Sequence, residues 1–316
     1  MRVIVGRTLP AAGLDRLSAG FSVRVGGPTA DADWLRDEVR GAAGLVTDPT
    51  MPVDDALITA AGDSLRVVSQ FAVGYDNVDL DALRRHGVRL TNTPDVLTDA
   101  TAELAVGLML AAGRRLVETD GVVRRGGWTG WEPEGFLGVQ LSGATVGLVG
   151  LGRIGRRTAE MLAGFDVDLR YWSRTRDGSA EAELGLRWAE WDELLARSDF
   201  LSLHVPLSDE THNLIDTRAL ELLKPGAILV NTARGGLVDT EALVGALRSG
   251  RLAAAGLDVY EDEPNVPAEL IDLPQTVLAP HVGSATRRTR DDMAVMCAEN
   301  VIAVLEGGEP PSEVPL

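Results

Sequence analysis

The sequence is poor in several residue types, and each scarcity excludes a class of protein. Cys297 is the only cysteine, so a disulfide within the chain is impossible and a cysteine-based zinc cluster is not expected. The longest apolar run, Leu104–Gly113, is too short to cross a bilayer. The N-terminus lacks the apolar core and small-residue cleavage site of a signal peptide. We therefore expect a cytoplasmic protein that holds no metal and enters no membrane.

Positive charge is also scarce. Lysine and arginine together number 30 against 47 aspartates and glutamates, which gives a formal net charge of −17. Such an acidic chain repels phosphate backbones and anionic membrane surfaces, so neither is an expected partner. Hydrophobic residues make up 45% of the chain and charged residues 24%, as in ordinary globular proteins. The length of 316 residues is enough for about two domains.

Short apolar, β-branched runs alternate with helical patterns along the chain. This alternation is typical of α/β units on a parallel sheet, and it occurs in two series. The expected strands of the first series are Val3–Val5, Val23–Val25, Gly44–Thr47, Val67–Phe71 and Val88–Thr91. Those of the second are Thr145–Gly150, Val167–Trp172, Phe200–Val205, Ala227–Asn231, Ala255–Val259 and Thr276–Ala279. The pattern predicts two doubly wound, Rossmann-like domains.

The first series ends near Pro94–Thr98, where a turn precedes a long apolar helix. That helix is expected to lead from one domain into the other. A second long helix is expected at Arg287–Leu305. Because it follows the last strand of the second series, we expect it to cross back to the first domain.

A glycine-rich turn is the strongest local motif. Gly150, Gly152 and Gly155 form G-x-G-x-x-G directly after an apolar strand and at the start of a helix. In that context the first glycine permits the tight turn, the second admits a pyrophosphate, and the third lets helix and strand pack closely. We expect the turn, with Arg153 and Ile154 in its helix, to bind a dinucleotide through free N–H groups.

The residues after the next strand favour one cofactor over another. NAD sites usually carry an acid there for the ribose hydroxyls, but this chain has Ser173, Arg174, Thr175 and Arg176 before the first acid. Arginine and hydroxyl groups can bind a 2′-phosphate. This predicts NADP(H) as the preferred cofactor and NAD(H) as the second choice, against the alternative of a solvated basic loop.

Candidate catalytic residues lie just beyond the strands of the second series. Among the four histidines, His281 lies just after a strand and a proline, at the kind of strand end where doubly wound sheets place their sites. His204 lies at the end of an apolar strand, and we expect it to be a satisfied structural histidine. Arg234 also follows a strand and could bind a carboxylate. An acid partner lies at 261–263, where spacing alone cannot choose among Glu261, Asp262 and Glu263.

At this point the chain resembles a known family. The segments FAVGYDNVD, TPDVLTDATAELAVGLML, VGLVGLGRIG, ILVNTARGGLVD, AAGLDVYEDEP and APHVGSAT follow the order found in D-isomer-specific 2-hydroxyacid dehydrogenases. Within this family the likeness is closest to glyoxylate/hydroxypyruvate reductases, as GGWTGWEP and HVGSATRRTRDDM indicate. Phosphite dehydrogenases share much of this pattern but carry a lysine before the glycine of the substrate loop. This chain has Val73 there, which argues against phosphite as the substrate.

The resemblance implies a split architecture and a role for each matching residue. Residues 1–97 and 282–316 would form the substrate domain, and residues 98–281 an inserted NADP-binding domain. Glu263 would be the acid that pairs with His281, the proton donor, while Arg234 would bind the substrate. The remaining expected contacts are Val73, Gly74 and Ser284 with substrate, and Pro206, Thr232, Asp258 and Gly283 with cofactor.

Members of this kind are usually homodimers, which the resemblance therefore implies here. Trp131 would reach the partner subunit's active site, or else be buried in the interface without touching substrate. The expected reaction is reduction of glyoxylate and hydroxypyruvate by NADPH. Two alternatives stay open from the sequence: a D-lactate-type or bulkier 2-keto-acid reductase of the same fold, and a nucleotide-sensing regulatory protein.

Overall fold

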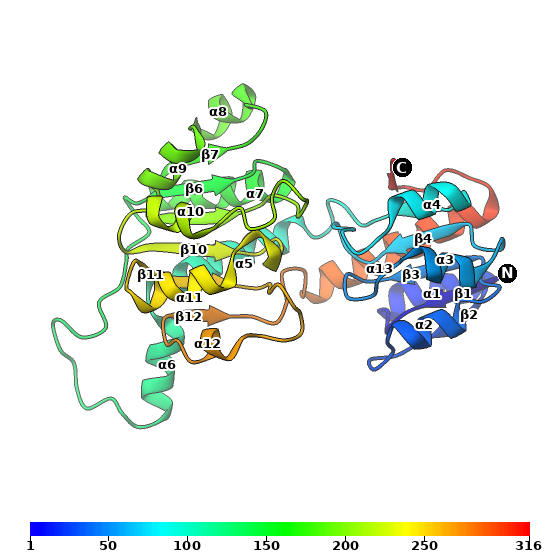
Figure 1. Ribbon diagram of the computed structural model, residues 1–316, viewed down its shortest axis with the longest axis horizontal. Helices are drawn as coiled ribbons and strands as arrows, with labels where there is room; N and C mark the ends of the chain where they lie inside the picture. Colours follow the sequence, from blue (N-terminus) through cyan, green and yellow to red (C-terminus); the bar gives the residue numbers. More distant parts are fainter. The chain divides into compact units, whose positions relative to one another are not determined.

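The computed structural model describes residues 1–316, which form two compact units. Unit 1 consists of Met1–Leu97 and Ser284–Leu316, and unit 2 of Thr98–Gly283. Each is built around a sheet of parallel strands, so the predicted α/β, doubly wound fold is confirmed (Figure 1). The chain returns to unit 1 two residues later than the expected boundary after His281, because Val282 and Gly283 donate their N–H groups to Asp258 of unit 2.

Unit 1 has a six-stranded sheet in the order β13-β5-β4-β3-β1-β2, with five parallel strands and the last strand of the chain antiparallel at one edge. The strands are β1 (Arg2–Val5), β2 (Ser22–Val25), β3 (Gly44–Thr47), β4 (Val67–Gln70), β5 (Arg89–Thr91) and β13 (Glu313–Val314). The helices are α1 (Ala11–Gly20), α2 (Ala32–Glu38), α3 (Asp55–Ala61), α4 (Leu80–His86) and α13 (Arg287–Glu306).

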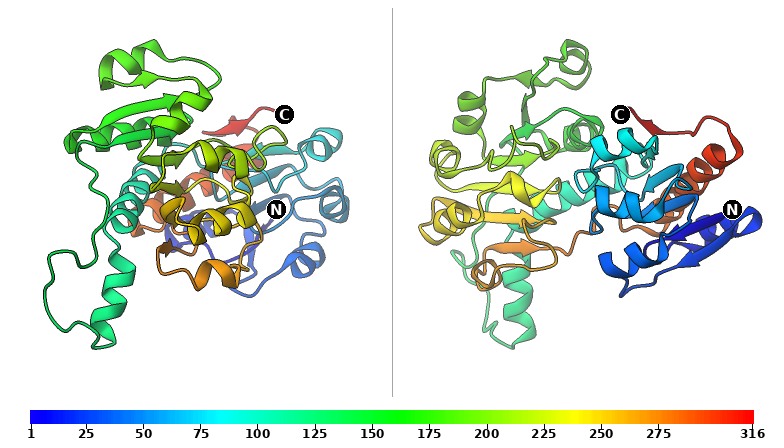
Figure 2. Two further views of the ribbon diagram at one scale, coloured as in Figure 1. Left: turned by 60° about the vertical axis from the view of Figure 1, so that its left-hand side comes forward. Right: turned by 45° about the vertical axis from the view of Figure 1, so that its right-hand side comes forward.

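Both faces of this sheet are buried, which explains why its strands read as continuous apolar runs. Helices α2, α3 and α4 cover one face through Leu35, Ile58 and Leu83. Helices α1 and α13 cover the other through Leu17 and Val301 (Figure 2). The final helix therefore packs in the first unit, as the order of elements in the sequence predicted.

Unit 2 has a seven-stranded, fully parallel sheet in the order β12-β11-β10-β9-β6-β7-β8. The strands are β6 (Thr145–Val149), β7 (Asp168–Trp172), β8 (Arg187–Trp188), β9 (Phe200–Leu203), β10 (Ala227–Asn231), β11 (Leu252–Leu257) and β12 (Thr276–Leu278). The helices are α5 (Thr98–Gly113), α6 (Leu116–Arg124), α7 (Arg153–Leu162), η1 (Ala163–Phe165), α8 (Gly178–Leu184), α9 (Trp191–Arg197), α10 (Thr217–Leu222), η2 (Gly235–Leu237), α11 (Thr240–Arg248) and α12 (Ala268–Ile271).

Two apolar clusters sandwich this second sheet. Helices α5 and α7 contribute Met109 and Leu162 to one, and α9, α10 and α11 contribute Leu194, Leu220 and Leu247 to the other. Helix α6 and the segment after it extend away from the rest of the unit in every view (Figures 1 and 2). None of the helices is both long enough and apolar enough to cross a membrane.

Many of the acidic residues have a local structural role. Aspartate side chains cap helix N-termini by accepting from a backbone N–H three residues later, at distances of 2.8–3.0 Å, which satisfies donors that the helix leaves unpaired. The capping residues are Asp31, Asp54, Asp79, Asp177, Asp216 and Asp239.

All eleven expected strands are present, with ends that differ by a few residues, and two strands were missed. β8 and β13 are two residues long, too short to show any periodicity. β11 begins at Leu252 and ends at Leu257, earlier than expected. Its expected last residues, Asp258 and Val259, instead belong to the loop that carries the polar site.

Candidate active site

The polar side chains singled out in unit 2 gather at the carboxyl ends of its strands. The strand order reverses between β6 and β9, the point at which doubly wound sheets open a crevice for ligands. The glycine-rich turn follows β6, and Pro206 follows β9. Arg234 follows β10, Asp258 follows β11, and His281 follows β12.

The three glycines of the turn have distinct geometries. Gly150 has φ of +97°, a conformation that L side chains rarely adopt. A Cβ on Gly155 would lie 2.3 Å from the carbonyl oxygen of Gly150, so only glycine lets α7 start this close to the strand. A Cβ on Gly152 would meet nothing within 4 Å, so this side of the turn is open.

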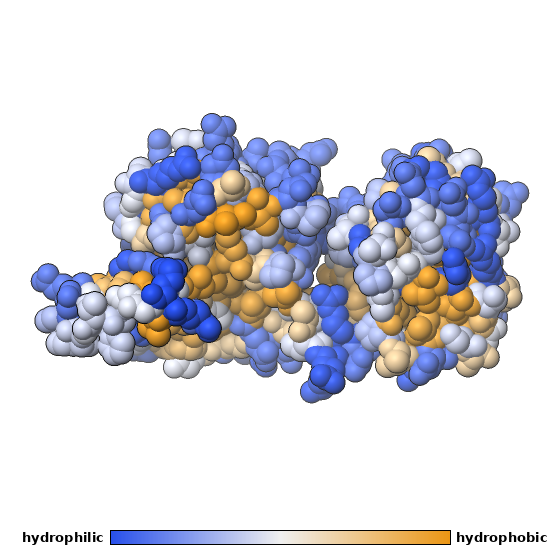
Figure 3. All heavy atoms as spheres, turned by 90° about the horizontal axis from the view of Figure 1, so that it is seen from below, coloured by the Kyte–Doolittle hydropathy of each residue, from blue (hydrophilic) through white to orange (hydrophobic).

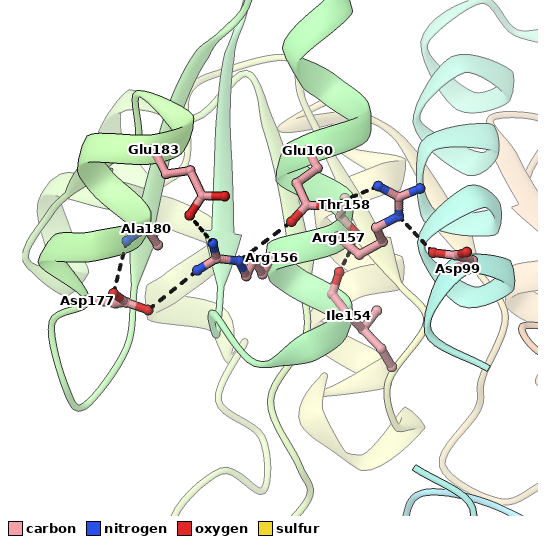
Figure 4. Close-up of polar contacts among 9 residues, drawn as sticks. All are labelled: Asp99, Ile154, Arg156, Arg157, Thr158, Glu160, Asp177, Ala180 and Glu183. Carbon is pink, nitrogen blue, oxygen red and sulfur yellow. Dashed lines mark hydrogen bonds and ion pairs between the residues drawn. The ribbon is translucent and has the colours of Figure 1, made fainter. Parts of the chain in front are cut away.

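Helix α7 begins without a side-chain cap. Gly152 is its N-cap residue, so no side-chain cap is present at the first turn, which holds Arg153 and Ile154. The next two arginines are bound elsewhere, as Figure 4 shows. Arg156 forms ion pairs with Glu160, Asp177 and Glu183, and Arg157 lies 2.7 Å from Asp99 and 2.8 Å from Glu160. Those two arginines therefore hold α7 to its neighbours, and the start of the helix is left for an anion.

The two arginines of the loop after β7 lie in different environments. Arg176 makes two hydrogen bonds of 2.7 Å to the carboxylate of Glu181, which also accepts from Tyr171 at 2.9 Å. Arg174 has an 81% exposed side chain and only a contact of 3.4 Å to Glu210. Of the predicted phosphate-binding group, Arg174 is thus the arginine available to a ligand, while Arg176 belongs to an ion pair.

Among the buried polar atoms without a hydrogen-bond partner within the chain are Nε2 of His204, just after β9, and Oγ1 of Thr232, just after β10. The expectation that His204 is a satisfied structural histidine was wrong. The residues that border it, Gly150 and Gly155, carry no side chain that could pair with the ring. Burial lowers the pKa of His204 to about 4, so the ring is neutral. The unpaired His204 ring beside the glycine turn, with the Thr232 hydroxyl at the end of the neighbouring strand, fits a polar ligand such as a dinucleotide.

His281 and Glu263 form the most direct polar contact of the site. Nδ1 of His281 lies 2.7 Å from Oε2 of Glu263, and both side chains are partly exposed. The other carboxylate oxygen of Glu263 accepts the N–H of Tyr260 at 3.0 Å. Glu261 and Asp262 make no such contact with the histidine. The residues alone left three acids open, and this geometry agrees with the resemblance in selecting Glu263.

The charge state of Glu263 follows from its surroundings. Burial alone would raise its pKa, but the hydrogen bond with His281, the N–H of Tyr260 and the charge of Arg234 outweigh burial, so the pKa is lowered. An ionised carboxylate only accepts, so Nδ1 of His281 must carry a proton. The second ring nitrogen, Nε2, is left to exchange a proton with a ligand.

Asp258 fixes the backbone around His281. Its carboxylate accepts the N–H groups of Val282 at 2.7 Å and Gly283 at 2.8 Å, and its own carbonyl accepts the N–H of His281 at 2.9 Å. His281 has φ of +53°, which is uncommon outside glycine and is retained here by these bonds. Burial raises the pKa of Asp258 although both N–H donors oppose the shift.

Sequence reasoning missed Tyr260 and Asn231, whose side chains form hydrogen bonds with backbone carbonyl groups next to the site residues. Burial raises the pKa of Tyr260 to about 12, and its neutral hydroxyl donates to the carbonyl of Ala279 at 3.0 Å. Asn231 donates to the carbonyl of Arg234 at 2.8 Å and so sets the turn from which that side chain leaves β10. Neither residue carries a sequence signal beyond its place at a strand end.

The remaining expected residues lie outside this cluster. Val73 and Gly74 belong to the loop after β4 in unit 1, and Ser284 is the first residue of that unit's second segment. Trp131 lies in the segment after α6 with an 80% exposed side chain. The structure leaves their roles as predictions.

The family model for the NAD-binding domain of D-isomer specific 2-hydroxyacid dehydrogenases matches residues 106–283. The chain is 46% identical to a glyoxylate reductase of Thermococcus litoralis over 319 residues, which cover 99% of this chain and 96% of the relative. It is 47% identical to a glyoxylate reductase of Aeropyrum pernix over 320 residues, covering 99% and 95% of the two chains.

The chain is also similar to solved structures over nearly its whole length. The TT0316 protein of Thermus thermophilus superposes with a TM-score of 0.94 at 46% identity, covering 100% of both chains. An NADPH-dependent glyoxylate/hydroxypyruvate reductase of Sinorhizobium meliloti, solved with NADP and malonate, superposes with a TM-score of 0.89 at 35% identity, covering 99% of this chain and 96% of that one.

Proposed function

The chain belongs to the D-isomer-specific 2-hydroxyacid dehydrogenases, and we propose that it is an NADPH-dependent reductase of glyoxylate and hydroxypyruvate. The observation that carries the proposal is the 2.7 Å contact between His281 and the ionised Glu263, beyond strand ends of the sheet that also bears the glycine turn. A proton donor held in this way suits the reduction of a keto group to a hydroxyl. The names of the relatives above support glyoxylate as a substrate.

Each residue has one task in the proposed reaction. The cofactor, when bound, supplies hydride to the keto carbon. His281 gives the proton on Nε2 to the keto oxygen, and Glu263 stabilises the charged imidazole before that transfer. Arg234 binds the substrate carboxylate and the keto oxygen, where negative charge develops. The N–H groups of Val73 and Gly74 bind the carboxylate, with Ser284 beside the substrate.

The cofactor preference is proposed from the loop after β7. The exposed guanidinium of Arg174, with Ser173 and Thr175, would bind the 2′-phosphate, and the absence of an acid at this position disfavours NAD. The fingerprint glycines and the first turn of α7 would hold the pyrophosphate. Pro206, Thr232, Asp258 and Gly283 would line the rest of the cofactor site.

A homodimer is proposed from the surface of unit 2. Figure 3 shows apolar side chains gathered on the face that carries α6. Large apolar side chains there and in the following segment are 44–80% exposed. Monomeric proteins rarely expose so many large apolar side chains in one region, and such a region is typical of a protein–protein interface. They are Leu116, Val117, Val123, Trp128, Trp131, Phe136 and Leu137.

Steady-state oxidation of NADPH and NADH tests the reaction, with glyoxylate, hydroxypyruvate, pyruvate and a branched 2-keto acid as substrates. Fast NADPH oxidation with the first two acids is the expected result. A preference for pyruvate or for the branched acid would assign a different reductase of the same fold. Tight nucleotide binding with no turnover on any acid would instead indicate a nucleotide-sensing protein.

Mixing two impaired variants tests the role of Trp131 across the dimer. In a mixed dimer of Trp131→Ala and His281→Ala subunits, one site has a native His281 and faces a native Trp131 on the partner. If Trp131 acts in the partner's site, mixing restores the substrate KM of that site to the wild-type value. If Trp131 only packs in the interface, mixing restores nothing. Sedimentation of the wild-type protein measures the dimer itself.

A further inference from the structure

The loop between β4 and α4 in unit 1 is fixed by hydrogen bonds to three successive carbonyl groups. The carbonyl of Ala72 accepts the N–H of Thr93 at 2.9 Å. The carbonyl of Val73 accepts Nδ2 of Asn92 at 2.9 Å. The carbonyl of Gly74 accepts Nε2 of Gln70 at 3.3 Å. The loop is therefore held by its carbonyl oxygens, two of them bound by side-chain amides.

This arrangement determines where the loop's N–H groups point. In a planar trans peptide unit, the carbonyl of one residue and the N–H of the next point in opposite directions. Because the carbonyls of Ala72 and Val73 are bound within the unit, the N–H groups of Val73 and Gly74 face away from those partners. Neither N–H donates to an acceptor of its own unit. Adjacent N–H groups without an acceptor in their own unit can together bind an anion.

Asn92 is itself held in one orientation. A carbonyl only accepts, so Nδ2 must face Val73 and Oδ1 must face the other way. There Oδ1 accepts the hydroxyl of Ser312 at 2.8 Å. The backbone carbonyl of Asn92 accepts Nδ2 of Asn300 at 3.1 Å, and Oδ1 of Asn300 accepts the N–H of Ser312 at 3.0 Å. The three residues close a ring of hydrogen bonds.

The ring joins segments far apart in the sequence. Asn92 follows β5, Asn300 lies on α13, and Ser312 precedes β13, which pairs antiparallel with β5. Asn300 is fully buried and Asn92 is 9% exposed. Burying two amides is unfavourable unless each group is paired, and a paired network then allows one arrangement only.

We propose that Asn92 is a positioning residue for the substrate carboxylate, and that the C-terminal segment holds it in place through Ser312 and Asn300. Asn92 sets the direction of the Gly74 N–H through the Val73 carbonyl, and its bond polarises that peptide unit toward an anion. This inference rests on the proposed function, because it takes Val73 and Gly74 as the amides that bind the carboxylate.

The test is Asn92→Asp in the full-length protein, which keeps the shape but replaces the donor with a repelling oxygen. We expect the KM for glyoxylate to rise at least about tenfold, the difference that one hydrogen bond to a charged group makes. We expect kcat to stay within about threefold, since a lost contact that serves ground and transition states alike raises KM alone. The Kd for NADPH is expected to be unchanged.

Thr91→Val is the matched control. Thr91 precedes Asn92, is fully buried and donates to the carbonyl of Val68 at 3.4 Å, away from the loop. Its replacement is expected to leave the KM unchanged. An unchanged KM in Asn92→Asp, or equal increases in both variants, would overturn the inference.

Ser312 provides a second test should Asn92→Asp not fold. Ser312→Ala removes the hydroxyl that orients Asn92 and is expected to raise the KM about threefold, and Ser312→Thr restores it. Equal KM values in wild type and Ser312→Ala would contradict the proposal.

The proposed function can fail separately. If the wild-type protein reduces no keto acid, that function is wrong, and calorimetry with oxalate then tests the loop alone. Weaker oxalate binding by Asn92→Asp, or by Ser312→Ala if the first does not fold, supports the inference. Affinities equal to wild type overturn it.

Discussion

The two units share one architecture, but different kinds of side chain lie at the carboxyl ends of their strands. In unit 1 the loop after β4 is held by neutral amides, those of Gln70 and Asn92. In unit 2 the equivalent edge carries charged groups, with Glu263 against His281 and Asp258 beneath them. Neutral hydrogen bonds keep one geometry over a wide pH range, whereas charged groups make a site respond to pH. We therefore expect the first edge to serve binding and the second to serve proton transfer.

Removing the proposed proton donor, His281, is expected to have the largest effect. His281→Ala should lower kcat for glyoxylate about 10²- to 10⁴-fold, the usual contribution of a general acid. NADPH affinity, measured by fluorescence titration, should stay near the wild-type value. The exposed His86 serves as the control, and its replacement by alanine should leave kcat unchanged. Turnover near wild type in His281→Ala would remove this histidine from the mechanism.

Neutralising Glu263 separates charge from shape in the same pair. Glu263→Gln should lower kcat about 100-fold, because the protonated imidazole loses its charged partner. The pKa of Glu263 is lowered, so in the wild-type protein its carboxylate stays ionised as the pH falls toward its ordinary value of 4.5. The wild-type rate should therefore hold until the pH falls below 4.5, where protonation of Glu263 removes the charged partner, whereas the variant, which has no carboxylate to titrate, should show no such fall. Coincident pH profiles would contradict this role.

The loop after β7, proposed to bind the cofactor, offers a matched pair of arginines. Arg174→Ala should raise the Kd of NADPH about 10- to 100-fold and leave that of NADH nearly unchanged, because only NADPH carries the 2′-phosphate. Arg176→Ala should change NADPH binding much less, since Glu181 already holds Arg176. Calorimetric titration of both nucleotides measures each value. Equal losses for NADPH and NADH in Arg174→Ala would argue against an NADP site here.

A stability difference is expected from His204. Its pKa is about 4 in the folded protein, below the ordinary value of 6.5, so the unfolded chain binds the proton first as the pH falls. The free energy of unfolding should be constant above pH 6.5 and decline as the pH falls to about 4. We expect a decline of roughly 2 kcal/mol, less than a fully buried histidine with this pKa would give, because the residue keeps some exposure. His204→Asn should flatten this slope in urea unfolding, and His212→Asn, an exposed control, should not. Identical slopes in wild type and His204→Asn would refute the linkage.

Local patterns in the sequence predicted much of the fold. Both series of strands, the turn at 150–155 and the final helix follow from residues close together in the chain. The two missed strands are pairings of two residues that only a neighbouring strand can stabilise. His204 was misjudged because the glycines beside it come from a different strand-turn unit.

The sequence by itself determined the alternation of strands and helices, the glycine spacing and the charge of the chain, because each depends on neighbouring residues. Tertiary structure decided which side chains meet. It put Glu263 rather than Glu261 or Asp262 against His281, and it joined Ser312 to Asn92 across 220 positions of sequence. Such contacts arise only when separate strands share one sheet edge, and no local pattern encodes that distance.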